Sequence, residues 1–137
     1  MRGRLSQRIQ ARAGFRVAVA HVVMRGAGRH GEIANVDFSE QALPDLRCLK
    51  GYSAVRTLNL SWCSSLTSLQ GIEGLTALTE LNLSQCSSLT SLQGIEGLTA
   101  LTVLDLGGCR SLEGVPGGLR TVIGEDIRAV QAWAART

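Results

Sequence analysis

The chain has 137 residues, a formal net charge of +3, 45% hydrophobic residues and only 4% aromatic residues. This length predicts one domain, and the low aromatic content predicts that its core is aliphatic. No run of about 18 apolar residues occurs, which excludes a transmembrane helix. The spacing of the four cysteines favours a reducing compartment. We therefore expect an intracellular, cytoplasmic protein, with organelle targeting and effector-type secretion as the alternatives.

The amino-terminal segment 1–32 is strongly basic. Residues 1–31 contain seven arginines and no acid, whereas residues 32–137 contain seven basic and eleven acidic residues. Arginines recur at every fourth position from Arg4 to Arg16, which predicts a basic stripe on a helix. We interpret the segment as a cap over the first structural unit. The alternatives are a transit-like targeting segment, a binding arm and disorder.

The centre of the chain contains two near copies of one segment. Thr57–Thr79 and Glu80–Thr102 are identical at 21 of 23 positions. Their apolar residues follow the pattern L-x-x-L-x-L-x-x-C-x-x-L, which starts again at Leu101. A fixed period of this length indicates stacked supersecondary units. We count four units, at about 33–54, 55–77, 78–100 and 101–118.

This pattern resembles the leucine-rich repeat family over residues 33–123. The resemblance implies an α/β solenoid with short parallel strands on a concave face, about four repeats and a capping segment at each end. Leu58, Leu81 and Leu104 are predicted to form one inward spine, with tight turns or 3₁₀ segments on the convex side. Thr121–Ile123 is predicted as a fifth, edge strand. The phrase L-x-L-S-x-C-S-S-L is similar to repeats of plant intracellular immune receptors and of bacterial and protist leucine-rich proteins.

Residues 124–137 are predicted to form a carboxyl-terminal capping helix. Glu125 and Asp126 place negative charge at its start, which suits the helix dipole. We expect Trp133 to pack on the last unit, with docking of a partner as the alternative. One apolar face is formed by Ile127, Val130, Trp133 and Ala134.

Three of the cysteines recur at intervals of 23 residues, at Cys63, Cys86 and Cys109. We expect these residues to be buried, with their thiols turned toward a loop backbone. Cys48 lies outside this series and is expected to be partly exposed. The spacing does not match the paired cysteines that commonly form disulfides or metal sites.

The strand residues between the ladder positions are predicted to line the concave face. Both differences between the near copies, Thr57 against Glu80 and Trp62 against Gln85, fall there. This is expected of a duplicated scaffold with a changed binding face, and neutral surface drift is the alternative. The predicted partner-binding residues are Asn35, Asp37, Glu40, Arg56, Thr57, Asn59, Trp62, Glu80, Asn82, Gln85, Val103 and Asp105.

Trp62 is the strongest single candidate because the corresponding positions are polar or glycine, so packing does not demand an indole. An exposed tryptophan among polar groups is typical of a binding hot spot. The alternative is that Trp62 folds over a neighbouring strand or the amino-terminal cap. The predicted face is mildly acidic, which favours a basic partner or one rich in hydrogen-bonding groups.

The sequence predicts no catalytic, cofactor or metal site. His21 and His30 have no cysteine or carboxylate at metal-ligand spacing. The G-x-G-x-x-G motif that starts at Gly26 precedes a predicted strand, whereas a dinucleotide fingerprint opens a helix. The resemblance implies a non-enzymatic protein–protein interaction module with a recognition, adaptor or effector-type role. The alternatives are nucleic-acid or anionic-surface binding through Arg2–Arg29, and a fragment or engineered repeat array.

Overall fold

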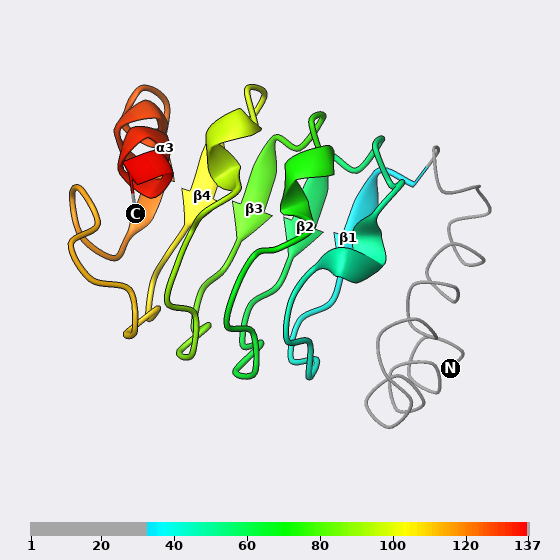
Figure 1. Cartoon of the computed structure of the whole chain (residues 1–137), viewed down its shortest axis with the longest axis horizontal. Helices are drawn as coiled ribbons and strands as arrows, with labels where there is room; N and C mark the ends of the chain where they lie inside the picture. Colours follow the sequence, from blue (N-terminus) through cyan, green and yellow to red (C-terminus); the bar gives the residue numbers. More distant parts are fainter. Residues whose placement is uncertain (1–32, 137) are drawn as a thin grey trace.

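The structure is a computed structural model that describes residues 33–136, so the basic segment predicted at 1–32 lies outside the described residues. Within this part, five short strands form one mostly parallel sheet, and one α-helix follows it (Figure 1). The strands lie in chain order across the sheet. They are β1 (Asn35–Asp37), β2 (Thr57–Asn59), β3 (Glu80–Asn82), β4 (Val103–Asp105) and β5 (Thr121–Ile123), and the helix is α3 (Asp126–Arg136).

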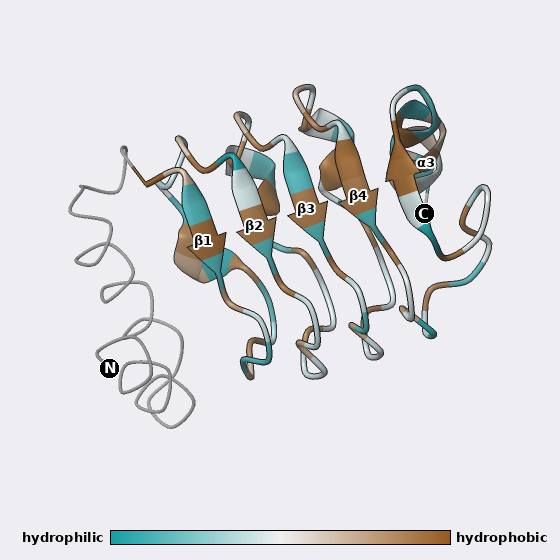
Figure 2. Ribbon diagram, turned by 180° about the vertical axis from the view of Figure 1, so that it is seen from behind, coloured by the Kyte–Doolittle hydropathy of each residue, from teal (hydrophilic) through white to brown (hydrophobic). Residues whose placement is uncertain are grey.

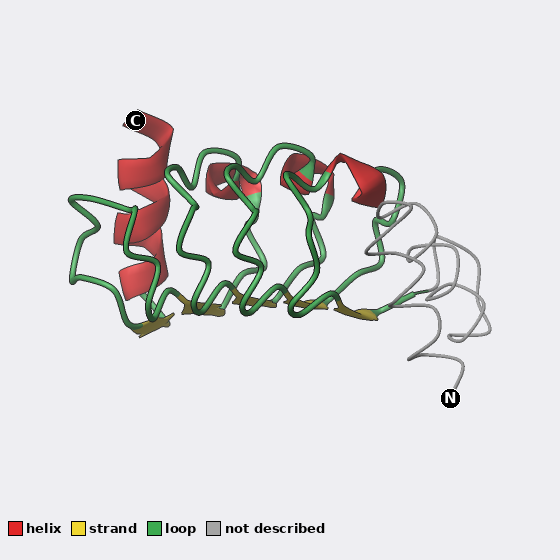
Figure 3. Cartoon of the chain, turned by 90° about the horizontal axis from the view of Figure 1, so that it is seen from below, coloured by secondary structure: helices red, strands yellow, loops and turns green. Residues whose placement is uncertain are grey.

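Three short 3₁₀ helices face the sheet from the opposite side of the molecule. They lie in one layer and the strands lie in another, with loops that connect the two (Figure 3). The predicted tight segments at the isoleucine positions are confirmed, because Ile72 and Ile95 each begin a 3₁₀ helix and are fully buried. The 3₁₀ helices are η2 (Arg47–Leu49), η3 (Ile72–Gly74) and η4 (Ile95–Gly97).

The central residues of the strands form a continuous buried row. Leu58 pairs with Leu81, and Leu81 pairs with Leu104 in the parallel register. All three are at most 2% exposed, which confirms the inward spine predicted from the sequence. The alternation in each strand explains the row, because successive side chains point to opposite faces of a strand.

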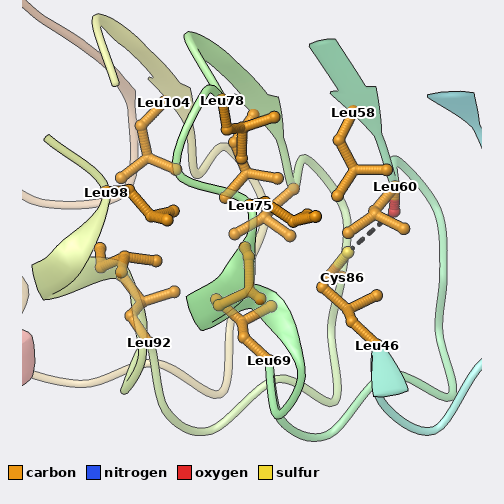
Figure 4. Packing of buried hydrophobic residues seen from close by; sticks show 14 of the residues in the cluster. Leu46, Leu58, Leu60, Leu69, Leu75, Leu78, Cys86, Leu92, Leu98 and Leu104 are labelled. Carbon is orange, nitrogen blue, oxygen red and sulfur yellow. Dashed lines mark hydrogen bonds between the residues drawn. The ribbon is translucent and has the colours of Figure 1, made fainter. Parts of the chain in front are cut away.

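The core lies between the sheet and the 3₁₀ layer. Leucines from the strands, such as Leu58 and Leu104, meet leucines from the opposite layer, such as Leu69 and Leu92 (Figure 4). Burial of this aliphatic surface is the main force that holds the two layers together. Phe38 and Tyr52 add two buried aromatic side chains at the β1 end.

The three cysteines that recur every 23 residues are buried, as the sequence predicted. Each thiol forms a hydrogen bond to the backbone of the preceding unit. The Cys86 thiol donates to the carbonyl oxygen of Leu60 at 3.0 Å (Figure 4), and Cys63 and Cys109 make the same contact with Phe38 and Leu83. Burial raises the pKa of the Cys86 thiol to about 12. These thiols therefore act as small apolar groups that satisfy a buried carbonyl.

Strand β5 departs from the parallel arrangement that the family resemblance implies. It pairs with β4 in antiparallel register, with Leu104 opposite Val122. Fifteen residues separate β4 from β5, whereas twenty separate β2 from β3. A parallel partner requires a crossover to the other end of the sheet, whereas an antiparallel partner can begin at the end where β4 stops. The shorter segment turns back through Gly117 and Gly118, both at positive φ.

Helix α3 occupies the place predicted for a carboxyl-terminal helix and packs against η4 and β5 (Figure 3). Ile127, Val130 and Ala134 are buried, and Trp133 packs partly buried against the core, as expected. Gln131 is also buried, which the apolar pattern did not predict. Its amide nitrogen donates to the carbonyl oxygens of Ile95 at 2.8 Å and Leu98 at 2.9 Å. Each of these carbonyls also accepts a backbone N–H, from Leu98 and Leu101 respectively, so Gln131 adds a second hydrogen bond to each and ties α3 to the end of η4. No helix between residues 33 and 136 is long and apolar enough to cross a membrane.

Candidate functional site

The face of the sheet that points away from the core, here called the open face, contains a shallow hollow of about 390 Å³. All three residues of β1, β2 and β3 line it, together with two residues of β4 and Thr121 of β5. Eight of the twelve predicted partner-binding residues are among them: Asn35, Asp37, Thr57, Asn59, Glu80, Asn82, Val103 and Asp105. The structure therefore brings most of the predicted residues to one surface.

The last residue of each parallel strand holds the turn that follows it. The Oδ1 atoms of Asp37, Asn59, Asn82 and Asp105 each accept the backbone N–H two residues later, at 2.9–3.0 Å. Aspartate and asparagine favour such turns because the side chain bonds its own backbone. The Oδ1 atom of Asn82 also accepts the Ser84 hydroxyl at 2.7 Å. Their alternation in the strands predicted a binding role for these residues but did not predict this structural role.

The first residues of the strands form a second row whose character changes across the sheet. Asn35 and Glu80 are polar, whereas Val103 and its partner Ile123 are apolar (Figure 2). The Thr57 hydroxyl donates to the Asn35 side-chain oxygen, which joins β1 to β2 at this level. Ile123 is 59% exposed. This row is thus polar at the β1 end and apolar at the β5 end.

Trp62, Glu40 and Gln85 lie after the strands, so their sequence-based assignment to the strands is wrong. Each follows its strand by three residues, in a turn with φ between 63° and 64°. The backbone N–H of Trp62 donates to the carbonyl oxygen of Ser84 at 2.8 Å, so each turn bonds to the next turn. Gly108 is the fourth member, at φ 78°. These residues form a row along the rim of the open face, here called the rim row.

The left-handed backbone of the rim row is costly for residues other than glycine. A Cβ in this conformation crowds the following carbonyl, at about 1–2 kcal/mol per residue. Gly108 avoids this cost, and its lack of a side chain leaves room for the Gln85 amide, which lies 2.5 Å from where a Cβ would stand. Trp62 adopts the same backbone with a bulky side chain that is 60% exposed.

Arg56, the only basic residue among the predicted set, does not line the hollow. Its side chain is exposed, and its backbone carbonyl accepts the Thr79 N–H, the Glu80 N–H and the Thr79 hydroxyl.

Thr121 lines the hollow but was not predicted to do so. The signal that identifies it is its place in β5, because Thr121 pairs with Asp105 and so extends the same row.

The charged side chains that line the hollow are all carboxylates: Asp37, Glu80 and Asp105. The remaining polar residues carry amides or hydroxyls. Within residues 33–136, no group of three metal-ligating side chains is close enough to hold an ion. The chemistry of the open face is therefore hydrogen bonding and attraction of positive charge.

A second depression of about 550 Å³ lies on the opposite side, beside η3 and η4. Its two acids already have partners. Glu73 accepts the backbone N–H of Gly71 at 3.0 Å, and Glu96 accepts that of Gly94 at 2.8 Å. These contacts hold the turns that start the 3₁₀ helices.

Comparison of the chain with protein-family models and with curated proteins finds no match.

Proposed function

We propose that the chain is a non-enzymatic protein–protein interaction module that binds its partner through the open face and the rim row. We further propose that residues 33–123 are a leucine-rich repeat solenoid. The second proposal is supported by contacts that recur at the sequence period. The hydroxyls of Thr79, Thr90 and Thr102 each donate to a carbonyl oxygen 23 residues earlier.

The proposal depends above all on where the near copies differ. Their identical residues build the core, the turns and the 3₁₀ helices. Of the four residues that differ, Thr57 and Glu80 line the hollow, and Trp62 and Gln85 occupy the rim row. Extended surfaces of stacked units commonly carry binding, and variation confined to one surface is expected when that surface selects the partner.

Trp62 adds a second line of support. The backbone at this position favours glycine, and an exposed indole gains little from packing. Residues held in unfavourable backbone conformations cluster at functional sites, and tryptophan is enriched among the residues that dominate binding energy. A contact between the indole and a partner explains why tryptophan stands there.

The non-enzymatic assignment is supported by the direction of the pKa shifts. Burial raises the pKa of Cys109 to about 11 and that of Cys48 to about 12. A raised pKa keeps a thiol protonated and therefore a poor nucleophile. The carboxylates and amides of the open face suit recognition rather than covalent chemistry.

The test compares the full chain with Trp62→Gly and with Gln93→Ala, an exposed residue of the opposite layer. Proteins captured from a lysate by the full chain are identified, and the affinity of each variant for them is measured. Trp62→Gly should weaken binding by more than about 1 kcal/mol without lowering the melting temperature, and Gln93→Ala should change neither. Equal binding by Trp62→Gly, or a loss of stability with binding unchanged, would contradict the proposal.

The alternative is binding of nucleic acid or an anionic surface through Arg2–Arg29, residues that lie outside the described part of the chain. The observation in its favour is the charge of residues 1–31, which have seven arginines and no acid. The carboxylates of the open face would repel phosphate, so this function would belong to the basic segment alone. Steep loss of nucleic-acid binding with salt, and its abolition when residues 1–31 are removed, would support it.

A further inference from the structure

We infer that the open face binds an extended basic segment of a partner polypeptide that crosses the strands, with two cationic side chains separated by three residues. This inference depends on the proposed function, because it names the chemistry of the partner at the same surface. Three features of the open face identify this occupant: the charge of the hollow, the spacing of its two aspartates, and the amide groups that lie between them.

The charge of the hollow favours a cationic occupant. Asp37, Glu80 and Asp105 line it, and none of the lysines and arginines between residues 33 and 136 does. In the described part of the chain, neither Asp37 nor Asp105 forms an ion pair. The Oδ2 atoms of Asp37 and Asp105 have no hydrogen-bond partner among residues 33–136 either. A basic side chain would supply that partner and neutralise the charge.

The spacing of the two aspartates sets the spacing of the cations. Asp37 ends β1 and Asp105 ends β4, in one row across the sheet. Three steps between neighbouring strands place them about 14 Å apart. An extended peptide advances about 3.3 Å per residue, so side chains four positions apart lie about 13 Å apart and point to the same side. The same distance is too long for the two carboxylates to share one metal ion.

The residues between the aspartates supply donors for the backbone of such a peptide. Asn59 and Asn82 lie in the same row, and the Oδ1 atom of each already accepts a backbone N–H of its own turn. The Nδ2 group of each is therefore oriented away from the turn. An amide nitrogen carries two hydrogens to donate, which suits the carbonyl groups of a peptide that crosses above it. The turns fix these amides in place, so little rotamer entropy is lost on binding.

The test measures binding of two synthetic peptides of the same composition to the full chain, by fluorescence anisotropy. Both consist of serine and threonine with two arginines, which are separated by three residues in the first peptide and adjacent in the second. The first peptide should bind up to about fivefold more tightly, because only it can reach both aspartates and so gains a second exposed ion pair. Failure of the first peptide to bind, or equal binding of the two, would overturn the inference.

The matched variant is Asp37→Asn combined with Asp105→Asn. Asparagine is the residue at this position in β2 and β3, where it forms the same turn, so the variant should fold and melt as the parent does. It should lose about tenfold in affinity for the first peptide and lose most of the salt dependence of binding. Unchanged affinity would overturn the inference. The effect of Trp62→Gly on binding of captured partners is measured separately from peptide binding. If the peptides fail to bind but Trp62→Gly weakens binding of a partner that is not basic, the inference fails and the proposed function stands.

Discussion

The two near copies, Thr57–Thr79 and Glu80–Thr102, have almost the same sequence and backbone but present different groups to solvent. Trp62 and Gln85 share a φ of 63° although one is an indole and the other an amide. Thr57 and Glu80 pair directly in the sheet. The core positions do not differ at all. Packing therefore fixes the interior of each copy, whereas side chains of the open face and rim row can change without moving the backbone.

The copies also differ in what they pack against. Gly71 and Gly94 are equivalent and both have φ above 100°. A Cβ at Gly71 would lie 2.4 Å from the backbone oxygen of Leu46, whereas a Cβ at Gly94 would meet the Ile72 side chain at 3.0 Å. The same substitution therefore has a different energetic cost at Gly71 and at Gly94, although their local sequences are identical, because the segments that precede the two copies differ.

The largest expected effect is on the shared interior. Leu81→Ala removes a 1% exposed side chain from the central row and should reduce the free energy of unfolding by about 2–5 kcal/mol. Leu119→Ala is the control, because Leu119 is 38% exposed and should change stability by less than about 1 kcal/mol. Urea denaturation measures both. Similar losses for the two variants would contradict the assignment of Leu81 to the packed interior.

The second prediction distinguishes the copies by their neighbours. Gly71→Ala should destabilise more than Gly94→Ala, because both variants carry the left-handed backbone cost of about 1–2 kcal/mol but only Gly71→Ala collides with backbone. Gly74→Ala is the control, since no atom lies within 4 Å of its Cβ position and its φ is negative. Thermal unfolding of the three variants gives the order. A larger loss of stability for Gly94→Ala than for Gly71→Ala would contradict the contacts described for the two glycines.

The third prediction concerns pH and the cysteine that the copies share. Burial raises the pKa of Cys86 from its ordinary value of 9.0 to about 12. Its contribution to stability is therefore complete below about pH 9 and decreases as the pH rises toward 12, because the unfolded thiol ionises first. Cys86→Ala should show a shallower alkaline decline in the free energy of unfolding, measured by urea denaturation between these pH values. Equal slopes would mean that this thiol ionises as easily in the folded state.

The smallest expected effect is a conversion of one copy into the other. Thr57→Glu combined with Trp62→Gln gives the first copy the two residues of the second, and the free energy of unfolding should change by less than about 0.5 kcal/mol. The new costs are small because both arise at the surface: the hydrogen bond from the Thr57 hydroxyl to Asn35 is lost, and the introduced carboxylate repels Glu80 in the neighbouring strand. A loss comparable to that of Leu81→Ala would show that the two surface residues are part of the packing.

Much of the fold followed from the period of the sequence. The row of Leu58, Leu81 and Leu104, the 3₁₀ helices at Ile72 and Ile95, and the buried cysteines were predicted from apolar spacing alone. Eight residues of the open face were predicted for the same reason, because alternation in a short strand decides which side chains point outward.

The remainder depends on contacts that spacing does not encode. The antiparallel direction of β5 depends on where a glycine-rich segment turns back, and glycine permits several turns. The left-handed conformation of Trp62 is set by its hydrogen bond to Ser84 in the next turn, which a tryptophan in the sequence does not suggest. The burial of Gln131 depends on the carbonyls of Ile95 in η4 and of Leu98 just after it, which lie more than thirty residues away in the chain.

The most direct test of the central claim is to map the contact surface by NMR on the full chain, with backbone amide shifts recorded as the peptide with separated arginines is added. We expect the largest changes at residues of the open face, among them Asn59, Asn82 and Asp105, and little change near η3 and η4. Shifts concentrated at Ile72–Gly74 and Ile95–Gly97, with the strands unaffected, would contradict the claim that partners bind to the sheet.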